Sequence, residues 1–191
     1  MKIREIIEQS IKVKRSISEN DETIRCIDRA VDMIVDAYSQ GGKVLFCGNG
    51  GSAADAQHLA AELSGRFYYD RPPLAAEALH VNTSYLTAVA NDYSFDMVFA
   101  RMVEAVGQKN DVLVGLSTSG RSSNVLKAFE QAKQKGMKVI AFTGSDTDCV
   151  VGVSDCILSV PSTDTPRIQE AHIMFGHIIC QLVEERIFPK K

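Results

Sequence analysis

Short apolar runs alternate with helix-like segments in the second half of the chain, and this alternation constrains the fold more than any other feature of the sequence. The runs at 111–116, 138–142 and 156–160 are short and nearly continuous, which is typical of strands covered on both faces of a sheet. Helices are predicted over 124–135 and 163–187. Because strands that alternate with helices pair in parallel through right-handed crossovers, the chain is predicted to be an α/β protein with a doubly wound parallel sheet.

The first half of the chain adds strands and helices in a less regular order. Residues 43–47 are predicted to form a buried strand, and a helix is expected over 53–63. A short strand at 75–79 and helical segments near 84–90 and 95–106 complete the pattern. The predicted sheet therefore has about five strands.

Two amphipathic helices are expected before the first strand. Their apolar residues recur at three and four positions, and they are Ile3, Ile6, Ile7, Ile11, Ile24, Ile27, Val31 and Ile34. At 191 residues the chain fits a single domain, with residues 1–40 as a helical segment and 41–191 as the α/β core. Because the two helices have no strands of their own to cover, we hypothesise that both pack against a neighbouring subunit and that residues 1–40 form an oligomerisation segment.

Composition excludes several classes of function. A net charge of −3 and a sequence pI near 5.8 provide no basic surface for a nucleic acid, so no nucleic-acid partner is expected. No apolar run approaches the ~18 residues of a membrane helix, and no secretory leader is recognised, so we expect a cytoplasmic protein with no membrane partner. The five cysteines show no C-x-x-C pair and are expected to be reduced and buried.

Two polar loops each follow a predicted strand and lead into a helix. They are GNGGSAAD at 48–55 and STSGRSS at 117–123. Glycine lets backbone N–H groups approach an anion, and the positive end of a helix dipole attracts it. Neither loop matches a nucleotide-binding motif. A tight turn would explain GNGG alone, but two such loops in one sheet favour a site for a small phosphorylated metabolite.

Two groups of polar residues are candidates for chemistry. His58 and Glu62 are four residues apart on a predicted helix, within reach of one metal or substrate atom, although a solvated surface pair is the alternative. Gln169 and His177 are eight residues apart, roughly 12 Å along a helix, so they share a ligand only by leaning together or by coming from different subunits. His172 points about 140° away from His177, and a structural role is the default for it.

A carboxylate and an imidazole beside a phosphorylated sugar suit aldose–ketose isomerisation through an enediol. Glu62 would move a proton between adjacent carbons, and His177 would move one at the oxygens. A bound Zn²⁺ could polarise the carbonyl through His and Glu ligands.

Six segments of the chain resemble the phosphoheptose isomerases of the sugar isomerase (SIS) domain family. They are GGKVLFCGNGGSAADAQHLAAELSGRF, AVANDYSF, VEAVG, DVLVGLSTSGRSSNV, KGMKVIAFTG and RIQEAHIMFGH. The resemblance implies a flavodoxin-like three-layer α/β/α fold and the conversion of D-sedoheptulose 7-phosphate to D-glycero-D-manno-heptose 7-phosphate. That reaction is the first step of bacterial heptose biosynthesis for lipopolysaccharide and other surface polysaccharides. It also implies a homotetramer with active sites at subunit interfaces and one Zn²⁺ per subunit.

The resemblance also implies roles for individual residues. The implied zinc ligands are His58, Glu62, Gln169 and His177, and the implied acid–base pair is Glu62 and His177. The implied substrate contacts are Asn49, Gly50, Gly51, Ser52, Glu62, Asn91, Asp92, Ser117, Thr118, Ser119, Ser122 and Gln169.

Other members of the family offer alternatives. One relative is a non-enzymatic tetramer that binds the bacterial replication initiator, and it keeps the glycine and serine loops but lacks the equivalents of Glu62 and His177. A module that only senses sugar phosphates is a related alternative. Arabinose 5-phosphate isomerases usually carry extra regulatory domains that 191 residues cannot include. The presence of both Glu62 and His177 favours the enzyme.

Overall fold

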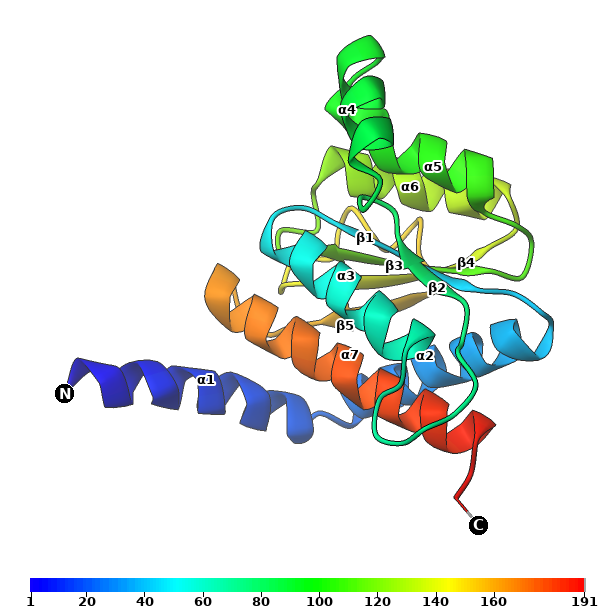
Figure 1. Cartoon of the computed structure of the whole chain (residues 1–191). Helices are drawn as coiled ribbons and strands as arrows, with labels where there is room; N and C mark the ends of the chain where they lie inside the picture. The colour runs from blue at the N-terminus through cyan, green and yellow to red at the C-terminus, as the bar shows by residue number, and fades with distance from the viewer. Residues whose placement is uncertain (191) are drawn as a thin grey trace.

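The computed structural model describes residues 1–190, and at its centre is a five-stranded, all-parallel sheet (Figure 1). The strands are β1 (Val44–Gly48), β2 (Ala76–Ala78), β3 (Val112–Ser117), β4 (Lys138–Thr143) and β5 (Cys156–Ser159). Their order in the sheet is β2-β1-β3-β4-β5. This is the flavodoxin-like doubly wound order, and the sequence-based prediction of the sheet is confirmed.

Helices cover both faces of this sheet. The helical elements are α1 (Lys2–Ser18), α2 (Asp21–Ser39), α3 (Gly51–Ser64), α4 (Thr83–Asp92), the 3₁₀ turn Phe95–Met97, α5 (Val98–Val106), α6 (Ser123–Gln134) and α7 (Thr165–Ile187). Helices α2, α3 and α7 lie on one face and α5 and α6 on the other, which gives three layers (Figure 1). All predicted helices are present, with ends that differ by a few residues from those expected.

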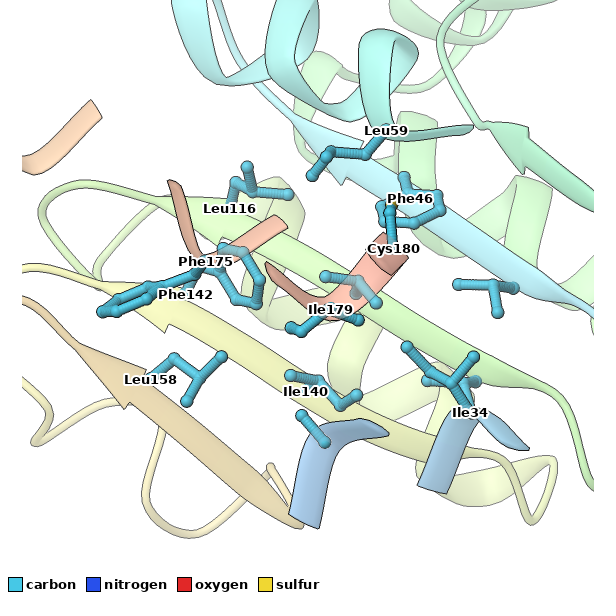
Figure 2. Packing of buried hydrophobic residues seen from close by; sticks show 14 of the residues in the cluster. Ile34, Phe46, Leu59, Leu116, Ile140, Phe142, Leu158, Phe175, Ile179 and Cys180 are labelled. Carbon is cyan, nitrogen blue, oxygen red and sulfur yellow. The ribbon is translucent and has the colours of Figure 1, made fainter. Parts of the chain in front are cut away.

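Alternation along the strands supplies a separate core to each face. Phe46 and Leu116 point toward α3 and α7, where Phe142 and Phe175 pack edge to face with ring centroids 6.0 Å apart (Figure 2). Leu45 and neighbouring strand residues point the other way and pack against α5 and α6. Every residue of β1 and β3 is buried, as expected for strands inside a three-layer sandwich.

The position at which the strand order reverses, between β1 and β3, determines where a ligand can bind. Strands β1 and β3 are neighbours in register, with Gly48 opposite Leu116, so the loops that follow them leave the sheet at the same edge. The chain then continues into α3 on one face and into α6 on the other. Divergence of two loops at such a switch point opens the crevice in which doubly wound proteins bind ligands.

The two N-terminal helices differ in how they bury their apolar stripes. Helix α2 packs within its own chain, and Ile27, Val31 and Ile34 are buried in the core. The hypothesis that both helices pack against a neighbouring subunit is therefore wrong for α2. Helix α1 extends away from the body of the protein (Figure 1), and its residues Ile3, Ile6, Ile7 and Ile11 are exposed, as is the preceding Met1, whereas Ile17 near its end is buried.

The cysteines also differ in part from expectation. None of the five forms a disulfide, and Cys47, Cys156 and Cys180 are buried. Cys149 is exposed and Cys26 is half-buried, so the prediction that all five are buried is wrong. Among residues 1–190, no helix has the length and apolar character needed to cross a bilayer.

Candidate functional site

The glycine loop, residues 48–51, makes the turn from β1 into α3. Gly50 has φ of +55°, a left-handed conformation that side chains rarely adopt, and it occupies the N-cap position of α3. A Cβ atom at Gly48 would lie 2.7 Å from the Ser52 carbonyl oxygen, so the turn closes tightly on itself. At the start of α3, the backbone N–H groups of Ser52 and Ala53 already donate to the carbonyl oxygens of Asn49 and Gly50 at 3.0 and 3.1 Å, whereas that of Gly51 has no backbone partner within residues 1–190. The Gly51 N–H group is therefore available to an anion at this edge.

The serine loop, residues 117–123, makes the corresponding turn from β3 into α6. The Ser117 hydroxyl lies 2.9 Å from the Ser122 hydroxyl and 3.5 Å from that of Ser119, so three hydroxyls gather at one point. Gly120 has φ of +67°, which lets the loop fold back over the strand end. The structure thus brings together three of the four predicted hydroxyl residues, and Thr118 lies between them in the same loop.

A pair of asparagine side chains ties the two loops to each other. Asn49 donates through Nδ2 to Oδ1 of Asn124, and Asn124 donates back to Oδ1 of Asn49, both at 2.8 Å. Asn124 is buried, in the first turn of α6. Sequence reasoning singled out Asn49 but missed Asn124, because only the fold places these distant positions side by side.

Gln169 lies against the glycine loop. A Cβ atom at Gly51 would come within 2.5 Å of Gln169 Nε2, so a side chain at this position would require movement of Gln169. Gln169 therefore occupies the beginning of α7 beside the beginning of α3. This location suits its predicted role as a substrate contact, and its assignment as a zinc ligand stays a prediction.

About two helical turns further along both helices, His58, Glu62 and His177 form a cluster. His58 Nε2 lies 3.1 Å from Glu62 Oε1 and 3.1 Å from His177 Nε2, and one ligand atom from each of the three residues lies within 4.8 Å of the others. The Phe67 ring packs beside His177, with centroids 5.7 Å apart. His58 and His177 thus share a site although they come from different helices, and the surface-pair interpretation of His58 and Glu62 does not account for the contact with His177.

The geometry of this cluster fits a bound Zn²⁺. Two imidazole nitrogens on one tetrahedral zinc, each at 2.0–2.1 Å, lie about 3.3 Å apart. The observed separation of 3.1 Å between the His58 and His177 Nε2 atoms is close to that value. Two imidazoles and a carboxylate are also the three-ligand set of many catalytic zinc sites, which keep one position open for substrate or water.

Asp55 lies one turn before His58 on α3 and was not predicted from the sequence. Partial burial raises the pKa of its carboxyl group above the usual value, and nearby His58 and His177 act in the opposite direction. The only available sequence signal was its spacing of three residues from His58, which is common on any helix.

His172 lies outside this cluster, as its spacing from His177 predicted. It is fully buried, and its Nε2 atom lies 3.1 Å from the Thr143 carbonyl oxygen. Burial lowers the pKa of His172 to about 4, although the hydrogen bond to Thr143 opposes this shift. The side chain is therefore a neutral structural histidine at physiological pH.

Asn91 and Asp92 lie at the end of α4, which projects from the rest of the molecule (Figure 1). Both are exposed, and the Asn91 amide donates to Asp92 Oδ1 at 2.9 Å. Their predicted role in substrate binding stays a prediction.

Comparisons with known proteins identify the family of this chain. Residues 8–144 match the model of the SIS domain family. The chain is 50% identical to a phosphoheptose isomerase of Clostridium acetobutylicum, over 97% of this chain and 94% of the relative. It is 47% identical to one of Aneurinibacillus thermoaerophilus, over 99% of this chain and 96% of the relative.

This chain belongs to the phosphoheptose isomerase family of SIS-domain proteins. A solved phosphoheptose isomerase from Neisseria gonorrhoeae superposes with a TM-score of 0.90 at 41% identity, covering 96% of this chain and 97% of that one. The protein is accordingly an enzyme, a phosphosugar isomerase, as the sequence predicted.

Proposed function

We propose that this enzyme converts D-sedoheptulose 7-phosphate to D-glycero-D-manno-heptose 7-phosphate through an enediol. The observation that carries the proposal is the cluster of His58, Glu62 and His177 on the two helices that begin at or beside the glycine loop. The names of the relatives support a phosphorylated heptose as the substrate. This reaction would be the first step of heptose biosynthesis for lipopolysaccharide or another surface polysaccharide, and we expect it in the cytoplasm.

In this proposal, Glu62 transfers the proton at carbon. Its carboxylate removes a proton from carbon 1 of the ketose and returns one to carbon 2, which yields the aldose. His177 moves the accompanying proton from the oxygen of carbon 1 to the oxygen of carbon 2. Because Glu62 and His177 belong to the same compact cluster, both can reach adjacent atoms of one substrate.

Substrate binding falls to the two loops. The hydroxyls of Ser117, Ser119 and Ser122 and the Gly51 N–H group at the start of α3 would supply donors for the phosphate without adding positive charge. Asn49, Gly50, Gly51 and Ser52 provide the glycine-loop side of this site, and Thr118 and Gln169 complete it.

Zinc is the proposed cofactor, with one ion per subunit held by His58, Glu62 and His177 and joined by Gln169. When bound, it would polarise the substrate carbonyl as a Lewis acid. Gln169 lies two turns away from His177 on α7. Coordination of the same zinc by Gln169 therefore requires movement of its side chain or a contribution from a second subunit.

A homotetramer is the proposed assembly. The exposed apolar residues of α1 need a partner surface. Asn91 and Asp92 are exposed at the end of α4, and this helix projects from the body of the subunit (Figure 1). We therefore assign Asn91 and Asp92 to the site of a neighbouring subunit, where they would contact substrate.

A non-enzymatic protein that binds the replication initiator is the alternative. Such a binding protein would need the glycine and serine loops but not the cluster of His58, Glu62 and His177. The presence of this cluster favours the enzyme.

The direct test is proton NMR of sedoheptulose 7-phosphate incubated with the metal-stripped protein, before and after addition of zinc. New anomeric signals of an aldose that depend on zinc would support both the reaction and the cofactor. Unchanged spectra from a folded oligomer in both conditions would contradict the isomerase assignment and favour a binding function.

A further inference from the structure

A buried ion pair lies at the end of the two helices that carry the His58, Glu62 and His177 cluster. Arg71 Nε donates to Glu184 Oε2 at 3.0 Å, and the two side chains are 1% and 0% exposed. Burying an ion pair costs desolvation free energy that apolar residues of similar size would not require. A specific geometric role would explain why the pair occurs here.

Arg71 holds the end of α3. The last carbonyl groups of a helix have no donors within the helix. Arg71 Nη2 donates to the carbonyl oxygen of Glu62 at 2.9 Å, and Nη1 donates to those of Leu63 at 2.8 Å and Gly65 at 3.1 Å. One planar guanidinium therefore fixes the backbone of the residue to which the proton transfer at carbon is assigned.

Glu184 connects this arrangement to α7. It follows His177 by seven residues, about two turns on the same helix. Its carboxylate accepts from the backbone N–H groups of Phe67 at 3.0 Å and Tyr68 at 2.8 Å, and the Phe67 ring packs beside His177. Although burial favours the neutral acid, these N–H groups and Arg71 lower the pKa of Glu184, so it is ionised at neutral pH.

We propose that Arg71 and Glu184 are positioning residues that set the separation between Glu62 and His177. Arg71 fixes the Glu62 backbone, Glu184 is part of the His177 helix, and the ion pair joins the two. The Phe67 and Tyr68 N–H groups bind the same carboxylate, so the connecting segment that carries Phe67 is fixed against His177 as well. This inference rests on the proposed function, since the cluster that it positions is the proposed zinc and proton-transfer site.

The test uses two variants that conserve volume, Glu184→Gln and Arg71→Lys. Glu184→Gln removes the charge, and Arg71→Lys keeps a charge but cannot reach several carbonyls as a planar fork. Each is measured for zinc affinity by competition with a chromophoric chelator, and for kcat and KM with sedoheptulose 7-phosphate. We expect zinc affinity and kcat each to fall by roughly 10-fold to 100-fold, the range found when residues that orient metal ligands are changed. KM should change by less than about threefold, because the phosphate-binding loops are untouched.

A matched control is available in Asp111→Asn. Asp111 is 1% exposed and pairs with Lys43 at 2.6 Å, where β1 and β3 begin, at the opposite edge of the sheet from the site. Loss of this pair should lower stability while leaving zinc affinity and kcat near those of the wild type.

Each outcome decides the proposal. Zinc affinity and kcat within threefold of the wild type in a folded Glu184→Gln or Arg71→Lys variant would overturn it, as would an equal loss in Asp111→Asn. If Glu184→Gln does not fold, Arg71→Lys carries the test, because it leaves the buried carboxylate paired. Wild-type protein that binds zinc but does not isomerise the sugar would refute the proposed reaction, while the affinity comparison still tests the positioning pair. Wild-type protein that binds no zinc would overturn the proposal that Arg71 and Glu184 position a zinc site.

Discussion

At the scale of single residues, the roles of three of the four histidines follow from their surroundings. His58 and His177 lie at the surface beside Glu62, whereas His172 is fully enclosed and bonded to the backbone. The same side chain is therefore proposed as a ligand or base at one place and is a buried packing residue at another. Burial and the identity of the neighbouring atoms decide between these uses.

His172 makes stability depend on pH. Its folded pKa of about 4 lies below the ordinary value of 6.5, so the unfolded state binds more protons between these values. This contribution to the free energy of unfolding is complete above pH 6.5. It is lost progressively as the pH falls toward 4, and the loss reaches about 3 kcal/mol. Urea unfolding of wild type and His172→Gln at fixed protein concentration from pH 7 to 4.5 should show a steeper loss in the wild type. Parallel curves would contradict the assignment of His172 as a buried neutral imidazole.

Ser119 is exposed in the serine loop, so its replacement should affect binding more than folding. Ser119→Ala removes one proposed donor to the phosphate, which is expected to cost on the order of 1–3 kcal/mol of binding free energy. The expected result is a KM raised by roughly 5-fold to 150-fold with kcat changed far less. Steady-state kinetics with sedoheptulose 7-phosphate provides the measurement. A KM equal to that of the wild type would count against phosphate binding by this loop.

Some residues of the site could be predicted from the sequence and others could not. His58 and Glu62 share a helix, so their spacing alone places them together. Asn124, Arg71 and Glu184 act through contacts with residues far away in the sequence, and no local pattern reports such a contact. Their types give no signal either, since a buried arginine and an exposed one look the same in a sequence.

At the scale of elements, α3 and α7 determine the geometry of the site by running side by side in the same direction. Gly51 meets Gln169 near their beginnings, His58 meets His177 further along, and the Arg71 and Glu184 pair joins their ends. Close approach depends on Gly176, where a Cβ atom would lie 2.4 Å from the Leu59 side chain. A larger residue at that point would push the two helices apart.

Gly176→Ala tests this close approach. Overpacking a well-filled contact typically costs 1–3 kcal/mol, and we expect a destabilisation of about that size together with weaker zinc binding. Gly152→Ala is the matched control, because a Cβ atom there meets nothing within 4 Å. Thermal unfolding and zinc competition provide the two measurements. Unchanged zinc affinity in Gly176→Ala would show that the spacing of α3 and α7 does not control the cluster.

The sequence predicted the elements themselves well because alternation and helical periodicity are local properties. It did not distinguish α1 from α2, since both have isoleucines at helical spacing. Only the packing shows that Ile27, Val31 and Ile34 of α2 complete the core beside α7, as Figure 2 shows for Ile34. The first three turns of α1 leave Ile3, Ile6, Ile7 and Ile11 exposed, as the hypothesis of a neighbouring subunit requires, whereas Ile17 at its end packs into the core of its own chain.

At the scale of the whole molecule, α1 is the element that the single chain does not explain. Four isoleucines along it and the preceding Met1 are exposed, and burial of such a stripe is a strong driving force for association. The proposed tetramer would cover these residues and would bring the exposed Asn91 and Asp92 of one subunit to another.

Light scattering should therefore give a mass about four times the 20.9 kDa of the chain. The double substitution of Ile3 and Ile7 by Lys should yield smaller species, because it places charges on the stripe of α1. Val151→Lys alters an equally exposed apolar residue outside the helices and should leave the mass unchanged. A monomer of 20.9 kDa at micromolar concentration in the wild type would refute the assembly.

The proposed isomerisation is tested by following sedoheptulose 7-phosphate by NMR in D₂O with zinc-loaded wild type, Glu62→Gln and His177→Gln. We expect the wild type to form the aldose and to exchange solvent deuterium into the carbon-bound positions. Each variant, still folded, should lower turnover by ~10² or more, because a general acid or base typically contributes 10²–10⁴. Turnover within threefold of the wild type in both variants would show that the chemistry takes place elsewhere in the molecule.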